Sequence, residues 1–125
     1  MKLLPALAVL VSFALAACAT EEAGTPTGSA CPTTNPPTYA SFGKTFTMNY
    51  CVSCHSKESE RRNGAPDDVN FDSESDLVLH ASAIDKLAAN GPKAMNLEMP
   101  PSEVLKQPSP VDREKLGQML ACMRP

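Results

Sequence analysis

The sequence has few of the large apolar side chains that usually build a protein core. Its 125 residues include no Trp, two Tyr and four Phe, and a chain of this length has room for a single domain. A domain this small with so few aromatics buries little large apolar surface. We therefore exclude a multidomain enzyme and expect the fold to need a further constraint, such as a cross-link or a bound group.

An excess of positive charge is also lacking. The chain carries 11 Lys and Arg against 14 Asp and Glu, which gives a formal net charge of −3. No stretch of the sequence is basic enough to form the positive patch that nucleic-acid binding requires. Nucleic acid is therefore not an expected partner.

Long apolar runs are absent except at the start. Positions 1–17 combine the basic Lys2, an apolar stretch over 3–15 and small residues before Cys18, which predicts a signal peptide too short to span a membrane. The tetrapeptide LAAC at 15–18 resembles a bacterial lipobox, so Cys18 is the predicted lipidated first residue of the mature protein. The alternative is an ordinary cleaved signal that leaves Cys18 as a spare thiol, a liability in an oxidising compartment. We expect the protein to be lipid-anchored on the periplasmic side of a bacterial membrane or at the cell surface.

The segment after the signal has almost nothing to bury. Pro, Gly, Ser and Thr dominate residues 19–38, a composition typical of solvated linkers. We predict a flexible tether over 18–38 and one folded domain over 39–125. Such a tether would let the domain meet partners at different distances from its anchor.

The most informative motif is the pentapeptide CVSCH at 51–55. Its Cys-x-x-Cys-His spacing is the c-type haem attachment pattern. Cys51 and Cys54 lie three residues apart on one turn and can bond to one porphyrin edge, and His55 then falls beneath the iron as its proximal ligand. Two alternatives compete. A redox dithiol would have a strand before the motif, whereas residues 39–50 look helical, and a zinc site would need a second Cys/His pair, which the sequence lacks.

The order of these features resembles that of small single-haem class I cytochromes c, of the type often found as exported bacterial lipoproteins. The resemblance covers about residues 38–125. A helix with Phe42 and Phe46 precedes the CVSCH motif, a Met-Pro-Pro sequence follows in a loop, and an amphipathic helix closes the chain. The resemblance implies an all-α, cytochrome c-like helical fold wrapped around one covalently bound haem c, and a protein that shuttles one electron.

Met99 is the first candidate for the distal iron ligand. It precedes Pro100, which pushes its backbone toward an extended conformation, and a neutral thioether on a stiff loop suits reduced iron. It also resembles the Met-Pro ligand loop of the family. Met95 and His80 are the alternatives, the latter because it belongs to an apolar helical pattern over 77–88 and can lie on a buried face. Either methionine could instead fill a gap in a core.

The segment between the predicted ligands, residues 57–70, is a charged loop. In the family a proline carbonyl in this region typically accepts the proton of the proximal histidine, and Pro66 is an approximate match in position. The other interpretation of Pro66 is a plain turn residue. Arg61 and Arg62 are candidates for contact with the haem propionates or with a partner, although most exposed charges only interact with solvent.

Residue types at helix ends predict another helix in the middle of the domain. Ser73 or Ser75 can cap a helix that runs through Asn90, and Gly91 is placed to terminate it.

The last helix is predicted to pack on the first. Ser109 provides a cap and Pro110 a first-turn residue, and apolar residues then recur at helical spacing over 116–123. Gly43 and Gly117 lie inside the two helices. A close crossing of the helices would explain both glycines, and simple surface positions would not.

The remaining cysteines form an even pair. With Cys18 assigned to lipid and the two motif cysteines to haem, Cys31 and Cys122 are left in an oxidising compartment. We predict that they form a disulfide. It would close a loop of roughly 90 residues and stabilise the fold by about 4 to 5 kcal/mol at most in the chain-entropy model.

These expectations combine into a membrane-tethered electron carrier that is not an enzyme. With iron held by His55 and Met99, no open position is left for a substrate. The expected partners are redox proteins that dock weakly on a monomer. A haem peroxidase, or the haem subunit of a larger oxidoreductase, is the second hypothesis and needs a vacant sixth position or a partner chain. A non-haem redox module that uses the Cys51/Cys54 dithiol is the third.

Overall fold

The computed structural model describes residues 24–124. The predicted signal peptide over 1–17, Cys18 and the first part of the predicted tether lie outside these described residues. The elements in chain order are a π-helical turn, η1 (Tyr39–Gly43), and four α-helices, α1 (Lys44–Tyr50), α2 (Glu74–Leu79), α3 (Ala81–Ala88) and α4 (Pro110–Met123). The described chain contains no strand, only an isolated antiparallel bridge between Asn90 and Met95. The fold is therefore helical, which agrees with the predicted all-α class.

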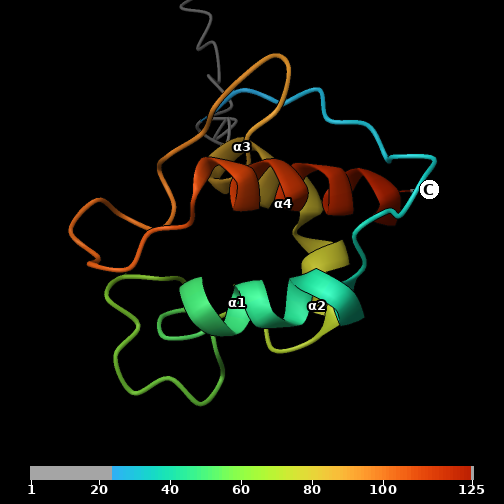
Figure 1. Ribbon diagram of the computed structural model, residues 1–125. Helices are drawn as coiled ribbons and strands as arrows, with labels where there is room; N and C mark the ends of the chain where they lie inside the picture. The colour runs from blue at the N-terminus through green and yellow to red at the C-terminus, as the bar shows by residue number, and fades with distance from the viewer. Residues whose placement is uncertain (1–23, 125) are drawn as a thin grey trace, which may run out of the picture.

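The helices lie in two levels in the view of Figure 1. Helix α4 runs across the upper part with α3 behind it, and η1–α1 runs below in the opposite direction. The core between these elements is small, and its largest side chains on the helices are one aromatic of α1, one leucine of α2 and three long side chains of α4. These residues are Phe46, Leu77, Leu116, Met119 and Leu120.

The first helix begins at a capping box. The Thr38 side chain accepts from the Ser41 N–H (3.0 Å), and the Ser41 hydroxyl accepts from the Thr38 N–H (3.0 Å), which satisfies two donors that a helix start leaves unpaired. Three aromatic rings then follow at helical spacing, with ring centroids 5.4 Å apart for Phe42 and Phe46 and 5.0 Å apart for Phe46 and Tyr50. The helix predicted from Phe42 and Phe46 is confirmed.

The predicted close crossing of the first and last helices is confirmed at one glycine and wrong at the other. A Cβ on Gly43 would lie only 2.6 Å from Sδ of Met119, so η1 and α4 touch at this point. A Cβ on Gly117 would instead meet the hydroxyl of Ser29 and the carbonyl of Asn90. Position 117 therefore requires glycine because the chain before η1, and not the first helix, passes over it.

The predicted helix from Ser73 through Asn90 is interrupted and ends early. Ser73 is its N-cap, with a capping box to Asp76, but the chain leaves the helical conformation at His80 (φ −105°, ψ 13°), which separates α2 from α3. Helix α3 ends at Ala88, because the Ala89 carbonyl accepts from the Asn96 N–H (3.0 Å). These tertiary contacts end the helix before the predicted stop at Gly91.

The beginning of the described chain packs against α3 and α4, and we call residues 24–31 the N-terminal strap (Figure 1, blue). The expectation that almost nothing in the predicted tether can be buried is wrong at Thr27, which is fully buried. Its main-chain N–H and its hydroxyl donate to the carboxylate of Asp85 on α3, at 3.0 and 2.5 Å. The Lys93 N–H donates to the Thr27 carbonyl (2.9 Å). Hydrogen bonds to a buried carboxylate hold the strap, which its polar composition did not predict.

The predicted disulfide is present. Cys31, at the end of the strap, is bonded to Cys122 in the last turn of α4, across a sequence separation of 91 residues. Helix α4 itself starts as predicted, with the Ser109 hydroxyl accepting from the Asp112 N–H (3.1 Å) and Pro110 in its first turn. The strap is therefore fixed to both long helices of the upper level.

Candidate functional site

The CVSCH motif forms a single turn directly after α1. Cys51 is the C-cap of that helix, and its N–H still makes a helical hydrogen bond to the Thr47 carbonyl (2.8 Å). The N–H groups of Cys54 and His55 then both donate to the Cys51 carbonyl, at 3.1 and 2.9 Å. Both thiols are free. Two thiols and an imidazole therefore come from one turn, as attachment of one porphyrin edge requires.

Burial changes the chemistry of the first thiol of the motif. Removal from solvent raises the pKa of Cys51 to about 12, against a smaller opposing effect from the Arg113 charge. Catalytic dithiols work through a thiolate and have lowered pKa values. The shift at Cys51 has the opposite sign.

The orientation of His55 is fixed from two sides by one segment. Its Nδ1 lies 3.0 Å from the Val69 carbonyl, and its own carbonyl accepts from the Phe71 N–H (2.9 Å). Because a carbonyl can only accept, Nδ1 carries the proton and Nε2 keeps its lone pair. Burial is the main cause that lowers the pKa of His55, so the ring is neutral at pH 7 and Nε2 is available as a ligand.

The prediction that the Pro66 carbonyl accepts the His55 proton is wrong. The acceptor is Val69, three residues later. The Pro66 carbonyl accepts instead from a guanidinium N–H of Arg62. The chain turns after Pro66, where the Val69 N–H donates to the Pro66 carbonyl (3.1 Å), and this turn brings Val69 under the imidazole.

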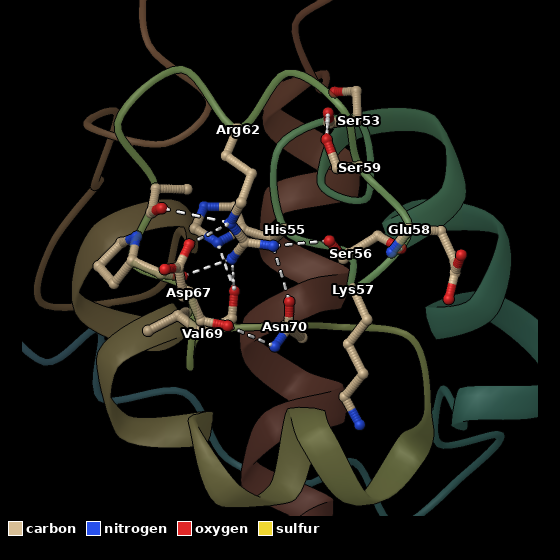
Figure 2. A network of polar contacts seen from close by, with 12 residues as sticks. Ser53, His55, Ser56, Lys57, Glu58, Ser59, Arg62, Asp67, Val69 and Asn70 are labelled. Carbon is tan, nitrogen blue, oxygen red and sulfur yellow. Dashed lines mark hydrogen bonds and ion pairs between the residues drawn. The ribbon is translucent and has the colours of Figure 1, made fainter.

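Arg62 organises the loop around His55, as Figure 2 shows. Its Nη1 donates to the Ser56 carbonyl (2.6 Å) and to Oδ1 of Asn70 (2.9 Å), and its Nη2 donates to the Val69 carbonyl (3.0 Å). Its Nε donates to the Ala65 carbonyl (3.3 Å), and the guanidinium forms an ion pair with Asp67 (3.6 Å). Arg62 was a candidate for contact with haem propionates or with a partner, but its donors are used inside the loop. Arg61 is exposed and makes no hydrogen bond or ion pair with the rest of residues 24–124.

The backbone of Met99 is held at both of its polar groups. Its N–H donates to the Leu87 carbonyl (2.8 Å), and its carbonyl accepts from Nη1 of Arg113 (2.7 Å). Its side chain is 38 % exposed. The structure thus fixes the main chain at this methionine and leaves the thioether on the surface.

The group that fixes the Met99 loop is a buried arginine that the sequence analysis missed. Arg113 is 3 % exposed and also donates to the carbonyls of Ala88 (2.7 Å) and Asn96 (3.2 Å) and to Oε1 of Gln107 (3.1 Å). Burial lowers the pKa of Arg113. The signal was available, because Arg113 lies one turn before Leu116 on the buried face of the last helix.

The two alternative iron ligands are placed differently. Met95 is 57 % exposed and forms the bridge with Asn90. His80 is half-buried at the junction of α2 and α3, with its ring edge-on to Phe71 (5.8 Å). The same Phe71 ring lies 4.8 Å from the His55 ring. Phe71 therefore contacts both histidines of the described chain.

The residues present fit a covalently held haem. The turn at 51–55 supplies two free thiols and the His55 lone pair. Exposed apolar side chains also occur on α2 and on the segment around Met99, namely Leu79, Leu97, Val104 and Leu105.

No group of three His, Cys, Asp or Glu side chains lies close enough to hold a metal ion in the part of the chain that the structure describes. A zinc site at the CVSCH turn therefore lacks the additional ligands that it needs. Within residues 24–124, no helix has the length and apolarity to cross a membrane.

The comparisons with known proteins place the chain in no family. No protein-family model, no curated protein and no solved structure matches it.

Proposed function

We propose that this protein is a membrane-tethered one-electron carrier of the class I cytochrome c type, with one covalently attached haem c. The observation that carries the proposal is the turn at 51–55, where two free thiols are joined to an imidazole whose Nδ1–H is engaged by the Val69 carbonyl. That hydrogen bond leaves Nε2 as the ligand nitrogen. A histidine that binds metal commonly donates its other ring N–H to a carbonyl in this way.

Each residue of the proposed haem site would have its own role. Cys51 and Cys54 would hold the haem covalently, His55 would be the proximal iron ligand, and Met99 the distal ligand. A haem bound in this way supplies reversible transfer of one electron. Val69 orients His55, and Arg113 fixes the main chain of the Met99 loop. With both axial positions taken, the chain needs no substrate pocket, because electron transfer requires only the approach of a redox partner protein.

The membrane part of the proposal rests on Cys18 and the leader before it. A lipid on Cys18 would hold the domain on the periplasmic side of a bacterial membrane or on the cell surface. The Cys31–Cys122 disulfide is consistent with such an oxidising compartment.

The first experiment tests the cofactor. The full chain is produced in a bacterial host with the haem-attachment machinery, and the mature protein is analysed by intact mass and by peptide mass over residues 51–55. We expect one added haem on that peptide, a cysteine-linked lipid at Cys18 and a Soret band. The matched control is C51A/C54A, which should carry no haem. A wild-type chain without added haem mass would overturn the proposal and favour a non-haem module.

The second experiment tests the distal ligand. M99A, M95A and H80A are compared by optical redox titration and by binding of carbon monoxide to the reduced protein. Only M99A should open the iron to carbon monoxide and lower the midpoint potential sharply, because only it loses the thioether. Prompt binding of carbon monoxide by the wild-type protein would instead favour a haem peroxidase or another catalytic role.

A further inference from the structure

The Val69 carbonyl serves two donors at once. It lies 3.0 Å from Nδ1 of His55 and 3.0 Å from Nη2 of Arg62. Figure 2 shows the guanidinium of Arg62 and the imidazole of His55 close together above Val69. A carbonyl oxygen has two lone pairs, so both hydrogen bonds can form together.

The position of Arg62 is strongly constrained. The side chain is half-buried, and its other N–H groups donate to the carbonyls of Ser56, Ala65 and Pro66 and to Asn70. Asn70 is itself buried and donates onward to the Asp67 carbonyl (3.0 Å). The ion pair to Asp67 is with an exposed carboxylate and contributes little. The hydrogen bond from Arg62 to Val69 is therefore held by the whole loop.

From this geometry we propose that Arg62 is a positioning residue that raises the reduction potential of the haem by sharing the Val69 carbonyl with His55. The inference rests on the proposed function, because it assumes that His55 is the proximal ligand. In this arrangement the His55 N–H and the cationic guanidinium of Arg62 donate to the same acceptor, the Val69 carbonyl.

The direction of the effect follows from electron donation. A carbonyl that already accepts from a cationic donor is a weaker acceptor for the His55 N–H, because its electron density is drawn toward the guanidinium. The imidazole then keeps less anionic character and donates less to ferric iron. The positive charge itself also favours the reduced form, which has one positive charge fewer. Both effects raise the potential, so loss of Arg62 should lower it.

The adjacent arginine supplies a matched control. Arg61 has the same charge one residue away, but it is exposed and makes no hydrogen bond or ion pair among residues 24–124. Screening by salt and solvent reduces the effect of such a charge. Any difference between variants at positions 61 and 62 therefore reports the contacts and the burial of Arg62 and not a change in the net charge of the loop, and R62K separates the contacts from the charge.

The test compares R62Q, R62K and R61Q as haem-loaded full chains. We expect R62Q to lower the equilibrium constant for reduction by up to about tenfold, which is about 59 mV for a one-electron couple. R62K, which keeps the charge but loses the fork of donors, should give an intermediate shift. R61Q should stay within about twofold, or about 18 mV on the same scale.

A second readout separates a direct effect on His55 from a general loosening of the loop. In the reduced protein, the proton NMR signal of His55 Nδ1–H moves downfield when its hydrogen bond strengthens. We expect a downfield shift in R62Q and none in R61Q. If circular dichroism shows that R62Q folds poorly, the comparison of R62K with R61Q becomes the test, because R62K keeps the charge and a donor at the same position.

The possible outcomes are distinct from failure of the proposed function. Absence of covalent haem in the wild-type protein removes the proposed function itself. If haem is present but the potentials of R62Q and R62K agree with that of R61Q, or if the His55 N–H signal does not move, the role of Arg62 is refuted while the carrier function stands.

Discussion

The two levels of this molecule are completed in different ways. On the upper side, the Thr27–Asp85 hydrogen bonds hold the strap on α3, and the Cys31–Cys122 disulfide joins its end to α4. We call these elements the closed half. On the other side, the turn at 51–55 and the loop over 95–107 keep free thiols and exposed apolar side chains. We call these two segments the open half.

The two halves differ in the contacts that hold them in place. Every buried side-chain polar atom among residues 24–124 has a hydrogen-bond partner, in both halves, but only the closed half also has a disulfide. In the open half, Arg113 fixes the main chain at Asn96 and Met99, while the Met99 side chain and several apolar side chains of the same loop stay exposed. In the proposed function, the closed half would act as a rigid support for the haem site.

The largest effect should come from removal of the haem attachment. C51A/C54A should lower the free energy of unfolding by on the order of 4 kcal/mol, because a ligand that binds only the native state stabilises that state. The loss should appear in the open half. Hydrogen exchange by mass spectrometry should show faster exchange over 51–72 and 95–107 and unchanged protection in α3 and α4. Equal loss of protection in both halves would show that they are not separate.

Removal of the disulfide is the matching test on the closed half. C31A/C122A should destabilise the holoprotein by about 3 to 4 kcal/mol, because the unfolded chain regains the entropy of a loop of this length. Guanidinium denaturation followed by circular dichroism measures the change. The midpoint potential should stay at the wild-type value, and a clear shift would mean that the strap also influences the site.

Arg113 joins the two halves, and its loss should affect both. R113M should cost about 2 to 4 kcal/mol, because it leaves buried carbonyls of α3 and of the Met99 loop without a donor. It should also free the Met99 loop, so that the reduced protein binds carbon monoxide faster than wild type. K115Q, an exposed change on the same helix, is the control for both measurements. Stable R113M protein that excludes carbon monoxide would contradict a role in holding Met99.

A smaller effect is expected where the strap meets α3. T27V keeps the shape of the side chain but removes its hydrogen bond to the buried carboxylate of Asp85, which should cost about 1 to 2 kcal/mol. Thermal unfolding of the holoprotein checks this value. T25V, an exposed change in the same strap, should be close to neutral, and equal losses in both variants would argue against a specific role for Thr27.

The smallest effect is a pH dependence at Asp72. Two hydrogen bonds lower the pKa of Asp72 below its ordinary value of 3.8. The larger effect comes from the Ser56 side chain and the next from the Lys57 N–H (3.0 Å). The native state therefore binds this proton less readily than the unfolded chain, so the contribution to stability is complete above pH 3.8 and is lost as the pH falls through the lower native value. D72N should flatten the acid limb of the melting temperature between about pH 5 and pH 2. D68N, at an exposed neighbour, should leave that limb unchanged.

Local patterns predicted the parts of this structure that depend on nearby residues. The helix with Phe42 and Phe46, the caps at Ser73 and Ser109 and the turn of the CVSCH motif all follow from neighbours within four positions. Cysteine counting predicted the disulfide as well, because only two thiols remained to pair.

The parts that were missed depend on distant residues. The early end of α3 follows from Asn96, and burial of Thr27 requires Asp85, 58 positions away. The partner of His55 is Val69 and not Pro66, because the turn after Pro66 brings the Val69 carbonyl under the imidazole. No periodicity or spacing in the sequence indicates which of several nearby carbonyls accepts a given hydrogen bond.

The docked strap limits how far the protein could travel from its anchor. Gly24 already lies against the main chain of Lys86 on α3, and only six residue steps separate it from Cys18. Even a fully extended chain covers about 20 Å in six steps, against about 70 Å for the twenty steps to Thr38. A lipid on Cys18 would therefore confine electron exchange to a thin layer next to the bilayer, and any donor or acceptor would have to present its own redox centre within that layer.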